Sequence, residues 1–294
     1  MEVKLAECAG FCFGVKRAVD TVYEQLNRDK IIYTYGPIVH NEEVVRELEE
    51  KGVCVLENTD QTREVKRGSV IIRAHGISRE VQQDLEDAGL ECIDATCPFV
   101  KRIHNIVDKA SAEGKYVVVV GNDSHPEVEG IKGWCRGPVC AVETAEEVER
   151  LCKSFDDEIQ KAGKSPDMFE ICIVSQTTFN YNKFQDIVEI FQKKGYNINI
   201  MNTICNATEE RQKSAQNLAR KADVMIVIGG KHSSNTRKLY EICKAECANT
   251  YYIQTLEDLH LEIPKAATLV GITAGASTPN KLIEEVQNYV RINF

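Results

Sequence analysis

Three segments of this chain begin alike, and each places a cysteine directly before an amphipathic helical pattern. The segments starting at Cys12 and Cys97 match closely, reading Cys-Phe-Gly-Val-Lys-Arg and Cys-Pro-Phe-Val-Lys-Arg, and the segment starting at Cys205, Cys-Asn-Ala-Thr-Glu-Glu-Arg, is looser. An internal repeat of this kind indicates a chain built from copies of one structural unit. We therefore expect three modules, with bounds 13–97, 98–204, and 205–294 together with 1–12.

Each cysteine-headed segment is followed by two further units, in which a short apolar run leads into a polar turn and then a helical pattern. The runs include residues 70–72, 116–120, 171–174, 224–228 and 268–272, and the turns are residues 36–41, 74–76, 121–127, 175–178, 229–235 and 274–279. Repeated strand, turn and helix predict small α/β modules with parallel sheets. The polar residues 156–167, which lengthen the second module, are expected to form a surface loop.

The turns are the expected place for a functional site, because ligands bind at the carboxyl ends of parallel strands. If the three modules pack with these ends facing one another, three thiols and six helix N-termini surround one central cavity. Helix N-termini bind phosphate oxygens without help from Lys or Arg. Side chains in the turns can add charge and hydrogen bonds, and the candidates are His40, His75, His125, Ser233, Asn235 and Ser277. Alternatively, Ser234, Ser277 and Thr278 are helix N-caps.

One cysteine per module, each between a strand and a helix N-terminus, suits a metal ligand because the helix dipole favours the thiolate. The chain has twelve cysteines but no Cys-x-x-Cys, so zinc-ribbon, thioredoxin and ferredoxin patterns are missing. Three thiolates would leave one iron of a [4Fe–4S] cluster open to act as a Lewis acid, whereas four would close it. The alternative is that Cys12, Cys97 and Cys205 are small buried packing residues of a repeated fold.

A candidate proton donor follows one of the strands. His125-Pro-Glu127 places an imidazole and a carboxyl beside the expected cavity, where burial would let the acid keep a proton for delivery. Thr177 is a smaller candidate, as part of a proton path from Glu127. The alternative for Glu127 is structural, because Ser124-x-x-Glu127 fits a capping box, and Thr177 could likewise be a cap. His104, His232 and His260 are assigned structural roles.

Composition excludes several other functions. The net charge is −9 and no cluster of Lys or Arg stands out, which argues against nucleic acid or an anionic membrane as a partner. No apolar run has the length of a membrane span, and the N-terminus has no signal segment, so we expect a cytoplasmic protein. In that reducing compartment, many cysteines indicate metal or redox chemistry rather than disulfides. P-loop, dinucleotide-binding and zinc-protease motifs are also missing.

Taken together, the motifs resemble those of the 4-hydroxy-3-methylbut-2-enyl diphosphate reductase family (IspH/LytB). They run from residue 10 to about residue 280, nearly the whole chain. The matching stretches are Gly10-Phe-Cys12-x-Gly14-Val-x-Arg17-Ala, Gly36-x-x-Val-His40-Asn41, Ala74-His75-Gly76, Asp94-Ala-Thr-Cys97-Pro, His125-Pro-Glu127-Val-x-Gly130, Gln176-Thr177-Thr178, Cys205-x-Ala-Thr, Ser233-Ser234-Asn235 and Thr273-Ala-Gly-Ala-Ser277.

The resemblance implies a pseudo-threefold α/β trefoil in which Cys12, Cys97 and Cys205 hold a [4Fe–4S] cluster with one open iron. It implies that His40, His75, His125, Ser233, Ser234, Asn235 and Ser277 bind the diphosphate of an allylic substrate. Glu127, beside His125, would deliver protons with the help of Thr177. The reaction implied is a two-electron reductive dehydroxylation to isopentenyl and dimethylallyl diphosphate. Electrons would come from ferredoxin or flavodoxin, because no flavin or nicotinamide motif is present, and we expect a monomer.

Two other functions are compatible with three cysteine-bearing modules. A cluster-dependent synthase such as quinolinate synthase also resembles this arrangement, but its reaction would need no external reductant. A non-catalytic iron–sulfur sensor or anion-binding module would need no acid, and Glu127 beside His125 argues against it.

Overall fold

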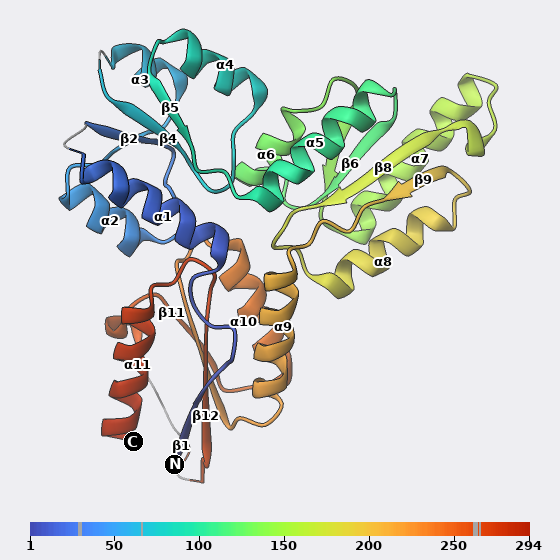
Figure 1. The fold of residues 1–294 in the computed structure, drawn as a ribbon. Coiled ribbons are helices and arrows are strands. Elements are labelled where there is room, and N and C mark those ends of the chain that lie inside the picture. Colours follow the sequence, from blue (N-terminus) through green and yellow to red (C-terminus); the bar gives the residue numbers. More distant parts are fainter. Residues whose placement is uncertain (29–30, 66, 261–263, 265) are drawn as a thin grey trace. The chain divides into compact units, whose positions relative to one another are not determined.

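The computed structural model describes residues 1–28, 31–65, 67–260, 264 and 266–294, and these form an α/β protein in which strands and helices alternate (Figure 1). The strands are β1 (Glu2–Leu5), β2 (Ile32–Tyr35), β3 (Cys54–Leu56), β4 (Ser69–Ile72), β5 (Glu91–Asp94), β6 (Tyr116–Val120), β7 (Val139–Val142), β8 (Glu170–Ser175), β9 (Asn197–Ile200), β10 (Val224–Ile228), β11 (Thr250–Ile253) and β12 (Leu269–Ala274). The helices are α1 (Phe13–Leu26), α2 (Glu42–Glu50), α3 (Thr59–Glu64), α4 (Arg79–Asp87), α5 (Pro98–Ala112), α6 (Pro126–Lys132), α7 (Ala145–Lys161), α8 (Tyr181–Gln192), α9 (Asn206–Ala219), α10 (Ser234–Glu246) and α11 (Asn280–Asn293), with short 3₁₀ turns at Pro166–Met168 and Leu256–Asp258.

The strands form three four-stranded sheets with the orders β1-β12-β10-β11, β3-β2-β4-β5 and β7-β6-β8-β9. The pairings β1–β12, β10–β11, β10–β12, β2–β3, β4–β5, β6–β7, β6–β8 and β8–β9 are all parallel. The prediction of small parallel-sheet α/β modules is therefore confirmed at the level of the sheets.

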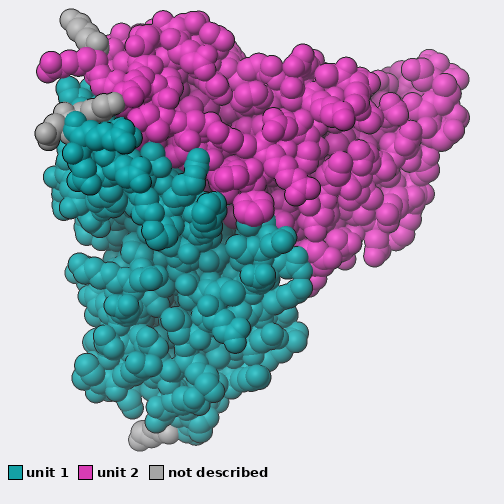
Figure 2. Space-filling view, viewed as in Figure 1, with its two compact units in different colours: residues 1–56, 205–294 teal, residues 57–204 magenta. Residues whose placement is uncertain are grey.

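The chain divides into two compact units (Figure 2). Unit 1 contains residues 1–56 and 205–294, and unit 2 contains residues 57–204. Unit 1 thus holds the sheet of β1, β10, β11 and β12 with the β2–β3 pair, and unit 2 holds the sheet of β6 to β9 with the β4–β5 pair. The bounds of the three modules stay a prediction.

The central strands are continuously apolar because helices cover both faces of their sheets. In β6, Val118 and Val120 pack with α7 and α8, whereas Val117 and Val119 pack with α5 and α6. The sheet of β10 and β12 repeats this arrangement, with α11 on one face and with α9 and α10 on the other. Side chains alternate along a strand, so each run supplies two separate cores.

All nine predicted strand, turn and helix segments are present. Strands β1, β5 and β9 lead through the cysteine-bearing turns into α1, α5 and α9, and the other six turns precede α2, α4, α6, α8, α10 and α11. Because the paired strands run parallel, the turns of one sheet lie at the same edge. The fold therefore gathers the candidate residues of each sheet at one end of it.

The expected loop at residues 156–167 is wrong in its first half, because α7 continues to Lys161. Phe155 and Ile159, one helical turn apart, are both buried, so the apolar stripe holds the polar residues between them in the helix. The start of α7 is fixed by a reciprocal capping box between Thr144 and Glu147. Within the described ranges no helix is both long and apolar enough to cross a bilayer.

Candidate active site

Cys12, Cys97 and Cys205 occupy the same local position, the N-cap of the helix that follows a strand. All three are half-buried, none has a side-chain hydrogen bond that caps its helix, and no disulfide joins any of the twelve cysteines, all of which lie in described ranges. They are the only cysteines at an N-cap among the helices that the structure describes. Each of the three cysteines therefore lies at the positive end of a helix dipole.

In unit 1 the turns after β2, β10 and β12 are in contact. The Ser277 hydroxyl donates a hydrogen bond to the His40 carbonyl oxygen over 3.0 Å. A Cβ at Gly230 would lie 2.8 Å from the same carbonyl, so glycine is needed where the turn after β10 meets the turn after β2. The Cys12 backbone amide donates to the carbonyl of Ala276 over 3.2 Å. His40, Ser277 and Cys12 are thus held together in one unit.

Ser233 caps a helix and can still donate a hydrogen bond through its hydroxyl group. Its hydroxyl oxygen caps α10 by accepting from the Thr236 amide over 3.2 Å, and it also accepts from the Thr236 hydroxyl over 3.0 Å. The N-cap of α10 is thus Ser233 and that of α11 is Pro279, so the cap alternative for Ser234, Ser277 and Thr278 is wrong. Because both bonds use lone pairs of Ser233, the hydroxyl hydrogen remains available to an anion at the helix N-terminus.

Asn235 gives the strongest sign of a missing ligand in unit 1. Its side chain is 4% exposed, yet neither amide atom has a partner within the part of the chain that the structure describes. A buried amide without hydrogen bonds is costly, so a polar ligand at the first turn of α10 would relieve the cost. Ser234, the preceding residue, is also buried. The start of α10 therefore has the properties of an anion site.

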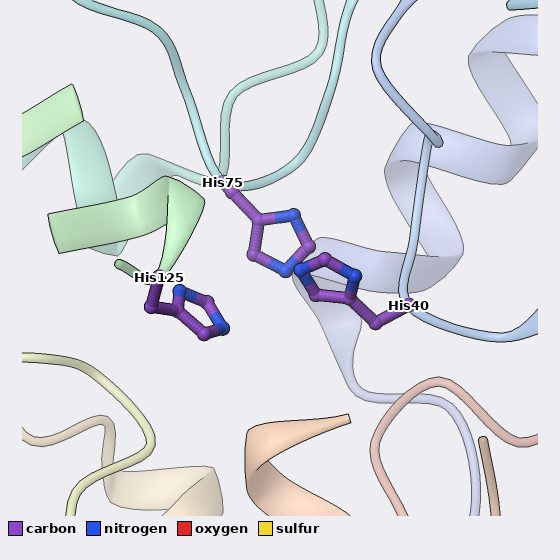
Figure 3. A group of neighbouring side chains, drawn as sticks. All are labelled: His40, His75 and His125. Carbon is purple, nitrogen blue, oxygen red and sulfur yellow. The ribbon is translucent and has the colours of Figure 1, made fainter. Parts of the chain in front are cut away.

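In unit 2 the turn bearing His75 contacts both Cys97 and His125. The Cys97 amide donates to the Ala74 carbonyl over 2.9 Å. The rings of His75 and His125 meet edge to face, with centroids 5.5 Å apart, and Figure 3 shows them converging from the turns before α4 and α6. His40, also labelled there, follows β2 in unit 1.

Glu127 is a buried acid held by Thr177. Its carboxyl accepts from the Thr177 amide over 2.6 Å and from the Thr177 hydroxyl over 2.8 Å. Burial raises the pKa of Glu127 from 4.5 to about 7, although the two bonds from Thr177 lower it. A carboxyl with this pKa can hold and release a proton near neutral pH, as a general acid must.

The capping-box alternative for Glu127 is wrong. Helix α6 begins with Pro126, and its N-cap is His125 rather than Ser124. The His125 Nδ1 atom accepts from the Glu127 amide over 3.1 Å, so a neutral His125 carries its proton on Nε2. Thr177 is not a cap either, because Asn180 caps α8. Instead of capping a helix, the side chains of Glu127 and Thr177 are hydrogen-bonded to each other.

Two buried polar residues, His104 and Arg211, are not among the catalytic, binding or metal-ligating residues predicted from the sequence. His104 is buried and stacks on Trp134 at a centroid distance of 5.2 Å, while His232 and His260 are exposed. Arg211, on α9, is 4% exposed. Its position six residues after Cys205 was the available sequence signal, but an arginine on a helix is normally exposed.

The donor set fits an iron–sulfur cluster. Thiols are the usual ligands of such clusters, and the three N-cap cysteines are not engaged in capping their helices. Each is half-buried, so a bound cluster would be partly shielded from water. Histidines at other turns, His40 in unit 1 and His75 and His125 in unit 2, could also ligate a metal, but thiolates favour iron–sulfur chemistry.

Comparisons with known proteins identify the family of this chain. A protein-family model described as LytB protein matches residues 3–291. The 4-hydroxy-3-methylbut-2-enyl diphosphate reductase of Caldanaerobacter subterraneus subsp. tengcongensis is 47% identical over 288 residues, covering 97% of this chain and 95% of that protein. The protein of the same name from Clostridioides difficile is 40% identical over 291 residues, covering 99% of each.

Two solved structures are similar along the whole chain. One, of (E)-4-hydroxy-3-methyl-but-2-enyl diphosphate reductase, the terminal enzyme of the non-mevalonate pathway, has a TM-score of 0.68 and 42% identity and covers 99% of both chains. The other, of the E-1-hydroxy-2-methyl-but-2-enyl-4-diphosphate reductase from Plasmodium falciparum, has a TM-score of 0.87 and 30% identity. It covers 99% of this chain and 87% of that one.

Proposed function

Because the chain belongs to the LytB protein family, we infer that it reduces 4-hydroxy-3-methylbut-2-enyl diphosphate to isopentenyl and dimethylallyl diphosphate, the last step of the non-mevalonate pathway. A C–O bond breaks, a C–H bond forms, and the hydroxyl leaves as water, so each turnover uses two electrons and two protons. The observation that carries the proposal is the common N-cap position of Cys12, Cys97 and Cys205.

We propose that these three cysteines hold a [4Fe–4S] cluster. When bound, the cluster would supply an open Lewis-acidic iron and single electrons. A small carrier protein such as ferredoxin or flavodoxin would deliver the electrons, and the chain would act as a monomer. The equivalence of the three ligand positions supports this assignment, since each combines a stiff strand end with a helix dipole.

The diphosphate would bind where α10 begins. Ser233 has a hydroxyl hydrogen to donate, Asn235 has a buried amide without a partner among the described residues, and the N-terminus of a helix attracts anions. Ser234, Ser277, His40, His75 and His125 would complete the binding of the substrate. This arrangement would bind phosphate without Lys or Arg, in agreement with a sequence in which no basic cluster stands out.

Proton delivery would belong to Glu127. Its carboxyl is protonated in about half of the molecules at pH 7, because its pKa is raised to about 7. Thr177 fixes both carboxyl oxygens, and His125 lies on the adjacent turn. Orientation by two hydrogen bonds keeps the acid in one position, which general-acid catalysis requires.

The test is anaerobic purification with iron and sulfide quantified, followed by reduction of the substrate with an artificial electron donor. Cys97→Ser should lose cluster and activity together, and Cys54→Ser, at an exposed cysteine of β3, is the matched control that should keep both. Full iron content in Cys97→Ser would contradict the ligand assignment. Turnover without a reductant would favour the synthase alternative, and a cluster whose spectrum ignores diphosphate would favour the sensor.

A further inference from the structure

Resting on the proposed function, we propose that Arg211 is a positioning residue that holds the ligand loops of Cys12 and Cys205 and balances the negative charge of the cluster that they bind. Arg211 lies on α9, which begins directly after Cys205. Its Nη2 atom donates to the Gly10 carbonyl over 2.7 Å, and its Nη1 atom donates to the Ala207 carbonyl over 3.4 Å. One guanidinium therefore connects the two segments of unit 1 that carry these thiols.

The Gly10 end of this connection is rigid. Gly10 has φ +91°, and a Cβ there would lie 2.9 Å from the Asn280 Oδ1 atom and 3.0 Å from the Ile283 Cδ1 atom. Only glycine fits this left-handed conformation, which directs the carbonyl to Arg211. Two residues later, the Cys12 amide is bonded to the backbone of the turn after β12. The loop before Cys12 is thus fixed from both sides.

The Arg211 guanidinium has no carboxylate partner among the residues that the structure describes. Arg211 is 4% exposed, forms no salt bridge with a carboxylate in the described ranges, and has a buried Nε atom without a partner. Burial lowers the pKa of Arg211, and the groups that oppose this are the sulfurs of Cys12, Cys8 and Cys205. A buried cation is stable only next to negative charge. Thiolates bound to a cluster would supply that charge.

This placement predicts two separable effects of Arg211. Its hydrogen bonds orient the Cys12 loop, as outer-shell groups orient metal ligands, so losing them should accelerate iron loss by about ten-fold or more. Its positive charge favours the reduced cluster, which carries one more electron, so losing the charge should lower the reduction potential. A purely structural arginine would affect only thermal stability.

The experiment compares three variants after anaerobic cluster reconstitution. Arg211→Met removes charge and donors, Arg211→Lys keeps the charge but not the planar fork, and Arg220→Met is the matched control. Arg220 lies at the end of the same helix, exposed and paired with Glu246. The readouts are the rate of iron loss to a chelator, the midpoint potential in an EPR-monitored titration, and Tm.

We expect Arg211→Met to lose iron faster and to have a lower potential, Arg211→Lys to lose iron faster at a near-native potential, and Arg220→Met to match the wild type. If Arg211→Met does not fold, native iron retention in Arg211→Lys overturns the inference. Native retention and potential in Arg211→Met, with only a lower Tm, also overturn it. A wild-type chain that binds no cluster would instead refute the proposed function, and this inference with it.

Discussion

Glu127 should keep its proton up to neutral pH, because it is 2% exposed and pairs with no cation among the residues that the structure describes. Burial raises its pKa from 4.5 to about 7. At pH 7 about half of the Glu127 carboxyls would then be protonated, compared with roughly one in 300 for an ordinary glutamic acid. This difference would let Glu127 serve as the proposed proton donor.

The same shift makes folding stability depend on pH. The difference between 4.5 and about 7 corresponds to roughly 3 kcal/mol, because the folded state disfavours the ionised carboxyl that the unfolded state allows. The stability contributed by the proton is complete below pH 4.5. It falls as the pH rises from 4.5 to about 7, since unfolding then releases a proton, and it is constant above.

Glu127→Gln is the variant that isolates this effect. The amide can accept from the Thr177 N–H and donate to the Thr177 hydroxyl, so the hydrogen bonds survive without a titrating group. The protonated carboxyl band in an infrared difference spectrum, wild type minus variant, should titrate near pH 7. Urea unfolding followed by the fluorescence of Trp134, the single tryptophan, should show the wild type losing stability relative to the variant as the pH rises from 4.5 to about 7.

A carboxyl midpoint below about pH 5, or parallel stability curves for the two proteins, would refute the reasoning. In catalysis, Glu127→Gln should retain cluster and diphosphate binding but cut turnover by about 10²-fold or more, as removal of a general acid does. Normal turnover in this variant would exclude Glu127 as the proton donor.

Three further results are expected. Asn235→Ala should weaken the binding of inorganic diphosphate, measured by calorimetry. It should not lower Tm, because the buried amide has no partner in the described chain, and a lower Tm would indicate a structural role. Thr177→Val should move the infrared midpoint of Glu127 above 7, since the lost hydroxyl bond lowers that pKa; a downward shift would contradict this. Between pH 6.5 and about 4, the wild type should lose up to roughly 3 kcal/mol of stability relative to His104→Leu, because burial lowers the pKa of His104 to about 4 and the neutral ring must charge; the emission of Trp134 reports the difference, and a difference that does not change with pH would contradict this.

The order of strands and helices could be predicted because its signals are local. Apolar runs such as residues 116–120 have strand length and end in turn residues, and the structure contains a strand there. The end of α7 could not be predicted in this way. Residues 156–161 are polar apart from Ile159, and they stay helical because Phe155 and Ile159 pack into a core formed with distant strands.

The identity of the candidate site was also predictable in part. The sequence places His125, Glu127 and Thr177 on turns, but the choice between an acid and a cap for Glu127 depended on where α6 begins. Pro126 at the first helical position was the available signal, because proline there moves the N-cap to His125 and leaves Ser124 outside the helix. Glu127 follows β6 and Thr177 follows β8, so the hydrogen bonds between them depend on how these strands pair and could not be predicted from the local sequence.

Glu127 and Arg211 illustrate two responses to burial, which disfavours any charged side chain. A carboxyl can become neutral by keeping its proton, and the raised pKa of Glu127 is this response. A guanidinium cannot lose its proton in a protein, so a buried arginine must instead be matched by negative charge. For Arg211 the groups in place to provide it are the sulfurs of Cys8, Cys12 and Cys205. The same desolvation that raises the pKa of Glu127 therefore argues that Arg211 needs a neighbouring anion, which Cys12 and Cys205 would supply as ligands of the proposed cluster.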